Sequence, residues 1–206
     1  MNASQLDLFR QGGGLGVDAT FGSTRRIALA RDAWLDFAPG LLAGSDVLFD
    51  LLRDRADWHT EERVMYQRTV TVPRLVTFLP EGRRVHPMVD ELRAILERRY
   101  ATAFPRVSAA LYRDGNDSVA WHGDTLARRM TEALVATVSL GGERCFRVRP
   151  TGGGPSIALT LRSGDLVVMG GTAQRTHQHC IPKVAHAAPR IALMFRPTWN
   201  EADATW

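Results

Sequence analysis

Apolar residues recur at helical spacing in two segments of the first half of the chain. The first segment follows Ser45 and Asp46, and either residue can cap the start of a helix. The second begins with Pro87, which fits the first turn of a helix because proline has no amide hydrogen to donate. The apolar faces consist of Val47, Leu48, Leu51 and Leu52 in the first segment and of Met88, Leu92, Ile95, Leu96 and Tyr100 in the second. We therefore predict two amphipathic helices.

The remaining patterns are typical of β-strands. Residues 66–79 are rich in valine and threonine and contain Pro73, which predicts extended structure near the edge of a sheet. After residue 105, short apolar runs alternate with glycine turns. The predicted strands are 107–112, 134–140, 144–149, 156–161, 166–169 and 190–195. Turn signals at 141–142 and 163–165 predict two hairpins, one joining the second strand to the third and one joining the fourth to the fifth.

Helices in front of many short strands predict an α+β fold with a sandwich or jelly-roll core and helices packed outside it. Residues 1–20 are polar and contain three consecutive glycines, so we expect a flexible N-terminal leader. The length of 206 residues fits a single domain, which we place at residues 21–206. Within it, the front part spans about 45–105 and the strand-rich core about 106–198.

Composition and charge narrow the class of protein. Hydrophobic residues make up 45% of the chain, and no run approaches the ~18 apolar residues of a membrane span, so we expect no membrane partner. A net charge of +4 and a pI of about 9.7 favour polyanionic partners. The two cysteines, Cys145 and Cys180, are too few for a disulfide framework, and we expect no secretory signal, because residues 1–9 have neither a basic start nor an apolar stretch. We expect a monomer in the reducing cytoplasm.

The late part of the chain carries a group of residues suited to metal and acid chemistry. His122 and Asp124 are two apart, so on a strand they point to the same face. Together with a second imidazole they form the set of two histidines and one carboxylate that leaves three positions of an octahedral Fe(II) open. Residue parity does not separate His177 from His179 as that second ligand.

Two arginines follow these candidate ligands. Arg190 and Arg196 are six apart, which places both on one face of the predicted last strand. A guanidinium binds a carboxylate through two parallel hydrogen bonds, so such a pair suits a dicarboxylic keto acid.

Three longer motifs carry a family resemblance: residues 117–124 (DSVAWHGD), 178–183 (QHCIPK) and 188–196 (APRIALMFR). As a set they resemble the AlkB family of Fe(II)/2-oxoglutarate dioxygenases, and within it the branch that demethylates nucleic acids. The likeness extends to residues 72–75 and 111–115 and covers roughly 55–198. It implies a double-stranded β-helix core, with residues 45–105 as the part that recognises the nucleotide.

For the metal, the resemblance implies that His122, Asp124 and His179 are the catalytic ligands of Fe(II), because the QHCIPK motif selects His179 over His177. The implied cosubstrates are 2-oxoglutarate and O2.

For 2-oxoglutarate, the resemblance assigns its distal carboxylate to Arg190 and its keto-acid end to Arg196, which would also lie near Asp124. Tyr112 matches a family tyrosine that hydrogen-bonds the cosubstrate. Two residues earlier the family commonly has asparagine, whereas this chain has Ala110. A missing hydrogen bond there would weaken binding by about 1 kcal/mol.

The implied activity is oxidative dealkylation of damaged bases in DNA, such as 1-methyladenine, 3-methylcytosine or etheno adducts, with release of formaldehyde, succinate and CO2. A base must leave the helix stack to reach a buried iron, so we expect aromatic and basic residues around the pocket. The candidate substrate contacts are Trp58, Arg74, Phe78, Trp121, Leu126 and Arg128. The family often has an acidic residue at position 126, and an apolar one would favour bulkier adducts.

Two alternatives stay open at this point. The same chemistry could act on RNA or on a protein, or the chain could be a metal-binding jelly-roll module without catalysis.

The leader contains a further motif. Residues 5–9 (QLDLF) resemble the pentapeptide that docks bacterial repair proteins on the sliding clamp. Such a peptide places leucine and phenylalanine in an apolar pocket of the clamp, while the glutamine hydrogen-bonds beside them. In the alternative, Leu6, Leu8 and Phe9 cover the chain's own domain.

Overall fold

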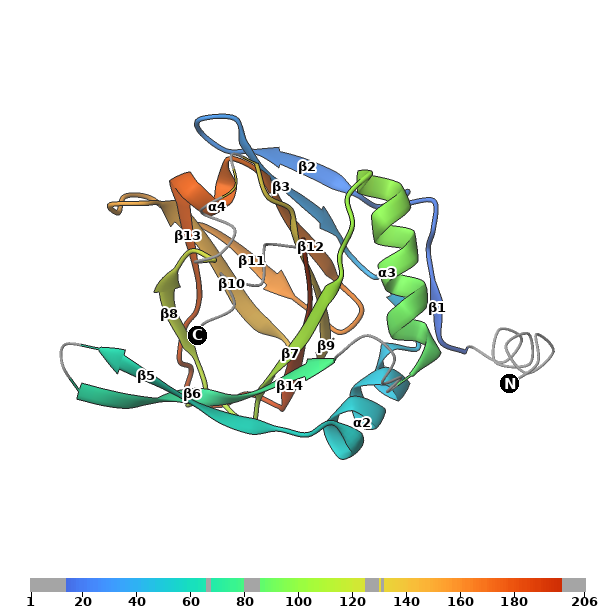
Figure 1. Cartoon of the computed structure of the whole chain (residues 1–206), viewed down its shortest axis with the longest axis horizontal. Helices are drawn as coiled ribbons and strands as arrows, with labels where there is room; N and C mark the ends of the chain where they lie inside the picture. Colours follow the sequence, from blue (N-terminus) through green and yellow to red (C-terminus); the bar gives the residue numbers. More distant parts are fainter. Residues whose placement is uncertain (1–13, 66–67, 80–85, 125–129, 131, 198–206) are drawn as a thin grey trace.

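Two facing β-sheets form the framework of the computed structural model, which describes residues 14–65, 68–79, 86–124, 130 and 132–197 (Figure 1). The larger, which we call the major sheet, has the strand order β2 (Arg25–Ala28), β3 (Ala33–Ala38), β12 (Leu166–Gly171), β9 (Val135–Gly141), β14 (Arg190–Arg196), β7 (Arg106–Tyr112), β6 (Arg68–Leu79) and β5 (His59–Met65). The minor sheet has the order β11 (Ile157–Leu161), β10 (Arg144–Pro150), β13 (His177–Ile181) and β8 (Val119–His122). A short pair, β1 (Gly16–Val17) with β4 (Leu42–Ala43), lies apart from both.

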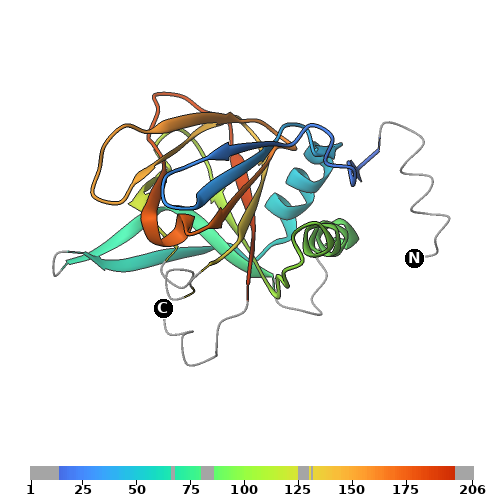
Figure 2. The same ribbon diagram turned by 90° about the horizontal axis from the view of Figure 1, so that it is seen from above.

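Two helices pack on the outer face of the major sheet, as Figures 1 and 2 show. They are α2 (Ser45–Arg55) and α3 (Pro87–Tyr100); the third described helix, α4 (Ala173–Thr176), is a single turn before β13. The α+β prediction of a jelly-roll core with helices outside is therefore confirmed. The predicted cap of α2 was wrong, because Gly44 occupies the cap position in a left-handed conformation. The Ser45 hydroxyl instead hydrogen-bonds to that of Ser163 at 2.7 Å.

The alternation of side chains along the central strands separates two cores. On β7, Val107, Ala109 and Leu111 pack with the helices. Their neighbours Ala110 and Tyr112 point the other way and join the core between the two sheets. Because successive residues of a strand face opposite sides, Ala110 and Tyr112 of β7 face the minor sheet while their odd-numbered neighbours face the helices.

Both predicted hairpins were wrong. β9 and β10 lie in different sheets, and so do β11 and β12, although glycine turns connect each pair. In this part of the chain a hairpin instead joins β10 to β11 through residues 151–156. A glycine turn reverses the chain whether the next strand joins the same sheet or the facing one. Glycines are needed at 141 and 142 because the turn after β9 packs against the carbonyls of Pro189 and Ala188.

The segment 14–20, which we expected to belong to the flexible leader, packs on the folded part. Leu15 is buried, and β1 pairs with β4. The division into a leader and one domain from residue 21 otherwise stays a prediction. β2 and β3 extend the major sheet at residues for which the sequence predicted no strand. No helix in the described part of the chain has the length and apolarity needed to cross a membrane.

Candidate active site

The inner face of the major sheet forms one wall of a pocket. β14 lies against β7 so that Arg190 pairs with Tyr112 and Ala192 with Ala110, in adjacent rows. These four residues line a cavity of about 120 Å³ between the two sheets. The small side chains of Ala110 and Ala192 leave room in the row next to the arginine, so a ligand held by Arg190 can extend along the strands.

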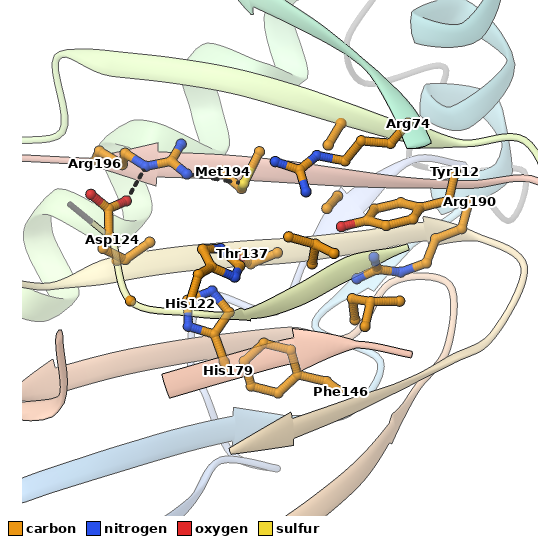
Figure 3. Close-up of a pocket in the computed structure, with 16 residues that line it drawn as sticks. Arg74, Tyr112, His122, Asp124, Thr137, Phe146, His179, Arg190, Met194 and Arg196 are labelled. Carbon is orange, nitrogen blue, oxygen red and sulfur yellow. Dashed lines mark hydrogen bonds and ion pairs between the residues drawn. The ribbon is translucent and has the colours of Figure 1, made fainter. Parts of the chain in front are cut away.

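His122 and His179 face the same pocket from the minor sheet. His122 on β8 and His179 on β13 are directly paired across the two strands, and their ring centroids are 4.3 Å apart (Figure 3). Nδ1 of His122 lies 2.8 Å from the Ala120 carbonyl oxygen, a contact that orients an imidazole for ligation through its other nitrogen. Burial, and after it the neighbouring His122, lowers the pKa of His179 well below its ordinary value, which favours the neutral form that binds metals.

The two candidate histidines on β13 lie in different surroundings. His179 lines the pocket, whereas His177 hydrogen-bonds to the Thr176 hydroxyl at 2.8 Å and does not line it. The choice of His179 from the QHCIPK motif agrees with this placement.

Asp124 enters the same pocket but its carboxylate faces Arg196. The Arg196 Nε donates to Asp124 Oδ2 at 2.6 Å, and the same guanidinium donates to the Ser108 hydroxyl at 2.7 Å. Arg196 therefore lies beside Asp124, as predicted. Among the described residues, no three His, Cys, Asp or Glu side chains are grouped closely enough to hold a metal ion. The carboxylate ligand of the proposed triad thus stays a prediction.

Arg190 is almost completely buried, with 1% of its surface exposed. Its Nε donates to the Ser139 hydroxyl at 2.9 Å, and its guanidinium carbon lies 5.3 Å from the Tyr112 ring centroid. Burial lowers the pKa of Arg190 to about 10, so the group is still a cation at neutral pH. Its Nη1 is buried and has no hydrogen-bond partner among the described residues. A buried cation with an unused donor indicates an anion-binding site.

Arg74 is a second buried guanidinium of the pocket. It forms an ion pair with Glu61, whose carboxylate oxygen lies 3.7 Å from Nη2, a distance longer than that of a hydrogen bond. Nε and Nη1 of Arg74 are buried and find no partner within the described ranges. Figure 3 shows this guanidinium directed over the pocket, on the side of Tyr112 and Arg190.

The other predicted substrate contacts lie elsewhere. Trp58 packs beside the helical core and donates to the Arg53 carbonyl, and Trp121 stacks with Arg149 at 4.1 Å; neither tryptophan lines the pocket. Phe78 is 52% exposed on β6 and does not line it either. Leu126 and Arg128 are outside the described residues.

Several lining residues were missed by the sequence reasoning. They are Val119, Val135, Thr137, Phe146, Ile181 and Met194. Most belong to strands that the sequence did predict, so alternation along each strand was the available signal. It could not be used because the pairing of strands into two sheets was not known.

Comparison with known proteins identifies the family. A model described as the 2OG-Fe(II) oxygenase superfamily matches residues 53–196. The chain belongs to this superfamily. Alpha-ketoglutarate-dependent dioxygenase alkB homolog 3 of Bos taurus is 27% identical over 78% of the chain, and DNA oxidative demethylase ALKBH2 of Arabidopsis thaliana is 32% identical over 53%. The matches span 64% and 43% of those proteins' own lengths.

A solved structure shows the same fold. OsALKBH1 superposes with a TM-score of 0.53 at 13% identity, covering 84% of this chain and all of that one. The superfamily match and the likeness to alkB homolog 3 confirm the predicted membership of the AlkB family of 2-oxoglutarate-dependent dioxygenases, and with it the implied use of Fe(II), 2-oxoglutarate and O2.

The pocket fits these groups. Nδ1 of His179 is buried without a hydrogen-bond partner among the described residues, and that ring lies against His122. With the Asp124 carboxylate, which stays a predicted ligand, the two imidazoles would supply the donor set that Fe(II) takes in oxygenases of this class. At the Arg190 end of the pocket, the buried Nη1 has no hydrogen-bond partner among the described residues and could donate to an anion such as the distal carboxylate of 2-oxoglutarate.

Proposed function

We propose that this protein oxidatively dealkylates damaged bases in DNA, with 2-oxoglutarate as the cosubstrate and with release of formaldehyde, succinate and CO2. The observation that carries the proposal is a single pocket lined by the paired histidines, by the small side chains of Ala110 and Ala192, and by Arg190. The Nη1 of Arg190 is buried there without a hydrogen-bond partner among the described residues. The candidate substrates are 1-methyladenine, 3-methylcytosine and etheno adducts.

The choice of DNA rests on likeness and on charge. One relative carries the name DNA oxidative demethylase. The chain has a net charge of +4, which suits a polyanionic substrate. An RNA or protein substrate is the alternative within the same chemistry. A cytoplasmic, monomeric protein remains our proposal for its setting, and both cysteines are free thiols, as a reducing compartment requires.

His122, Asp124 and His179 would hold the iron, which when bound supplies the oxidising power needed to break an unactivated C–H bond. Arg190 would bind the distal carboxylate of 2-oxoglutarate and fix its orientation, with Ser139 holding the guanidinium in place. Arg196 would hold the Asp124 carboxylate in place through its 2.6 Å contact.

Among the predicted substrate contacts that the structure describes, Arg74 is the one that lines the pocket and could contact the base. It is buried at the pocket, comes from β6 in the predicted recognition half, and carries two unused donors among the described contacts. In a site from which water is excluded, such donors fix orientation more strongly than at an exposed surface.

The test combines purified protein with Fe(II) and 2-oxoglutarate without oxygen, adds O2, and follows modified oligonucleotides by mass spectrometry. DNA strands carrying each candidate lesion should lose the alkyl group, with matched RNA strands for comparison. Asp124→Ala should abolish turnover, whereas Asp50→Ala, on the exposed side of α2, should not. Loss of Asp124 removes a predicted ligand rather than core volume, so the variant should remain folded, although it loses the ion pair with Arg196, and thermal unfolding measures that loss.

Other outcomes would replace the proposal. Faster reaction of the RNA strands would move the substrate to RNA. Metal binding without succinate formation on any strand would leave a non-catalytic jelly-roll module.

We also propose that residues 5–9 dock on the sliding clamp, as a feature separate from the reaction. They are outside the described residues, and the proposal rests on the QLDLF sequence. Purified clamp should be retained by the intact protein and not by a version lacking residues 1–10. Equal retention of the two would contradict the docking.

A further inference from the structure

Arg144 is a buried arginine to which the proposed reaction gives no role. It lies at the start of β10, on the inner face of the minor sheet with Phe146 and Val148, and only 3% of its surface is exposed. Burial lowers the pKa of its guanidinium. An arginine in such a place costs free energy unless its donors are used, so its contacts show what it stabilises.

Those contacts tie together two loops beside the histidine strands. Nη1 donates to the Asp114 carbonyl at 3.0 Å, and Nη2 donates to the carbonyls of Asp117 and Pro182 at 2.8 and 2.7 Å. Asp114 and Asp117 precede β8, which carries His122, and Pro182 directly follows β13, which carries His179. One side chain therefore fixes the chain on both sides of the metal-facing strands.

Arg144 also contacts the tyrosine of the keto-acid pocket. Its guanidinium carbon lies 5.5 Å from the Tyr112 ring centroid, and that of Arg190 lies 5.3 Å from the same centroid. The Tyr112 ring is 4% exposed, and in Figure 3 its hydroxyl points into the pocket beside Arg190. A ring that contacts both a tethered guanidinium and a buried one has little freedom to turn.

We propose that Arg144 is a positioning residue for the distal-carboxylate end of the pocket, where it holds Tyr112 in place to share the carboxylate with Arg190. The proposal rests on the family's cosubstrate and does not depend on which base is repaired. It also adds cationic charge behind the subsite, which favours a dicarboxylic keto acid over a monocarboxylic one.

The experiment measures binding by calorimetry in the presence of Mn(II), which does not support turnover, so the readout is separate from activity. The ligands are 2-oxoglutarate and 2-oxobutyrate, which lacks the distal carboxylate. Arg144→Met should weaken 2-oxoglutarate binding by about tenfold, the loss expected when a charge-assisted contact is misplaced, and leave 2-oxobutyrate binding within about twofold. An equal loss for both ligands would overturn the proposal, because it would indicate general disruption.

Two further variants separate positioning from a structural effect. Tyr112→Phe lacks the hydroxyl through which Arg144 is proposed to act. Combining it with Arg144→Met should therefore weaken binding little beyond Tyr112→Phe alone. Fully additive losses would contradict the proposal. Arg147→Met is the matched control, since Arg147 is exposed on the same strand and donates to the Ser156 hydroxyl.

Arg144→Lys covers the case in which Arg144→Met does not fold. Lysine keeps the charge but cannot donate to three carbonyls while presenting a planar group to the Tyr112 ring. Binding of 2-oxoglutarate should weaken several-fold, with 2-oxobutyrate unaffected. An affinity equal to that of the unmodified protein would show that Arg144 does not position the subsite.

Discussion

Arg190 carries its charge where water does not reach it, and the nearby side chains do not neutralise it. Among the described residues that line the pocket, Asp124 is the one carboxylate, and it is already paired with Arg196. Arg74 has an ion-pair partner in Glu61, so Arg190 is left as the cation that a ligand has to balance. A keto acid with two carboxylates fits that balance better than a neutral or singly charged ligand.

Ala110 gives the first prediction at the residue scale. It is 2% exposed, lines the pocket and pairs with Ala192 across the strands. If the family's asparagine makes a hydrogen bond that this chain lacks, Ala110→Asn should tighten 2-oxoglutarate binding by about fivefold, the equivalent of about 1 kcal/mol. Calorimetry in the presence of Mn(II) measures the change.

Ala192→Asn is the matched control for this substitution. It adds the same side chain to the same row, from β14 instead of β7. Since it brings bulk without the family's hydrogen bond, we expect weaker binding. Unchanged affinity in Ala110→Asn would mean that another residue already supplies the missing contact.

The residue scale also shows where sequence reasoning worked. Motif likeness placed His122, His179, Arg190 and Tyr112 in one pocket, because a family signature encodes a shared fold as well as chemistry. It failed for Trp121, although that residue is adjacent to His122. The pairing of β8 with β13 shifts register between Val119 and His122, so simple alternation does not give the direction of the side chain.

At the scale of elements, α3 shows how a local signal defines a helix. Pro87 occupies the first turn, as predicted, and the side chain of His86 caps the helix by accepting a hydrogen bond from the Met88 amide at 3.1 Å. The accepting atom is Nδ1, which can accept only while the imidazole is neutral. Burial, and after it the charge of Arg55, lowers the pKa of His86.

A pH dependence follows for this helix. Because the folded pKa of His86 is lowered, the unfolded chain takes up the proton first as the pH falls through the ordinary histidine value near ~6.5. The cap's contribution to stability is therefore complete above that pH and is lost below it. His86→Asn should leave stability at pH 7.5 nearly unchanged and reduce the loss between pH 7.5 and 5.5, since asparagine caps a helix at either pH.

Urea unfolding of the two proteins at both pH values measures this difference. His177 also has a pKa lowered by burial, so part of the pH dependence should remain in the variant. Identical slopes for the two proteins would show that His86 does not act as a titrating cap.

At the scale of the whole molecule, glycine turns carry the chain from one sheet to the other. A Cβ added to Gly142 would lie 2.5 Å from the Ala188 carbonyl oxygen, so the turn after β9 has no space for a side chain. Gly142→Ala should destabilise the protein by about 1–3 kcal/mol, through the displacement that such a contact requires. Thermal and urea unfolding measure the change.

Gly16→Ala is the control for that substitution. The nearest atom to its added Cβ is 4.0 Å away, and its backbone conformation suits any residue, so a change within about 0.5 kcal/mol is expected. Equal effects at the two positions would contradict a special role for the turn after β9.

The same turns explain why the fold class could be predicted while its connections could not. Strand positions follow from runs such as 107–112 and 190–195, which become β7 and β14. A glycine pair that reverses the chain has the same local signature whether the next strand continues the sheet or enters the facing one. That choice depends on packing between strands that are distant in sequence, which no local pattern contains.

The position of β14 has a consequence for how the chain is made. Although it is the last described strand, it lies between β7 and β9 in the middle of the major sheet. A ribosome-bound chain that has not yet emerged to residue 196 leaves both neighbours with unsatisfied edges, which are sites of aggregation. Newly synthesised copies should therefore depend on chaperones until β14 is released, and nonsense mutations anywhere before it should yield insoluble product.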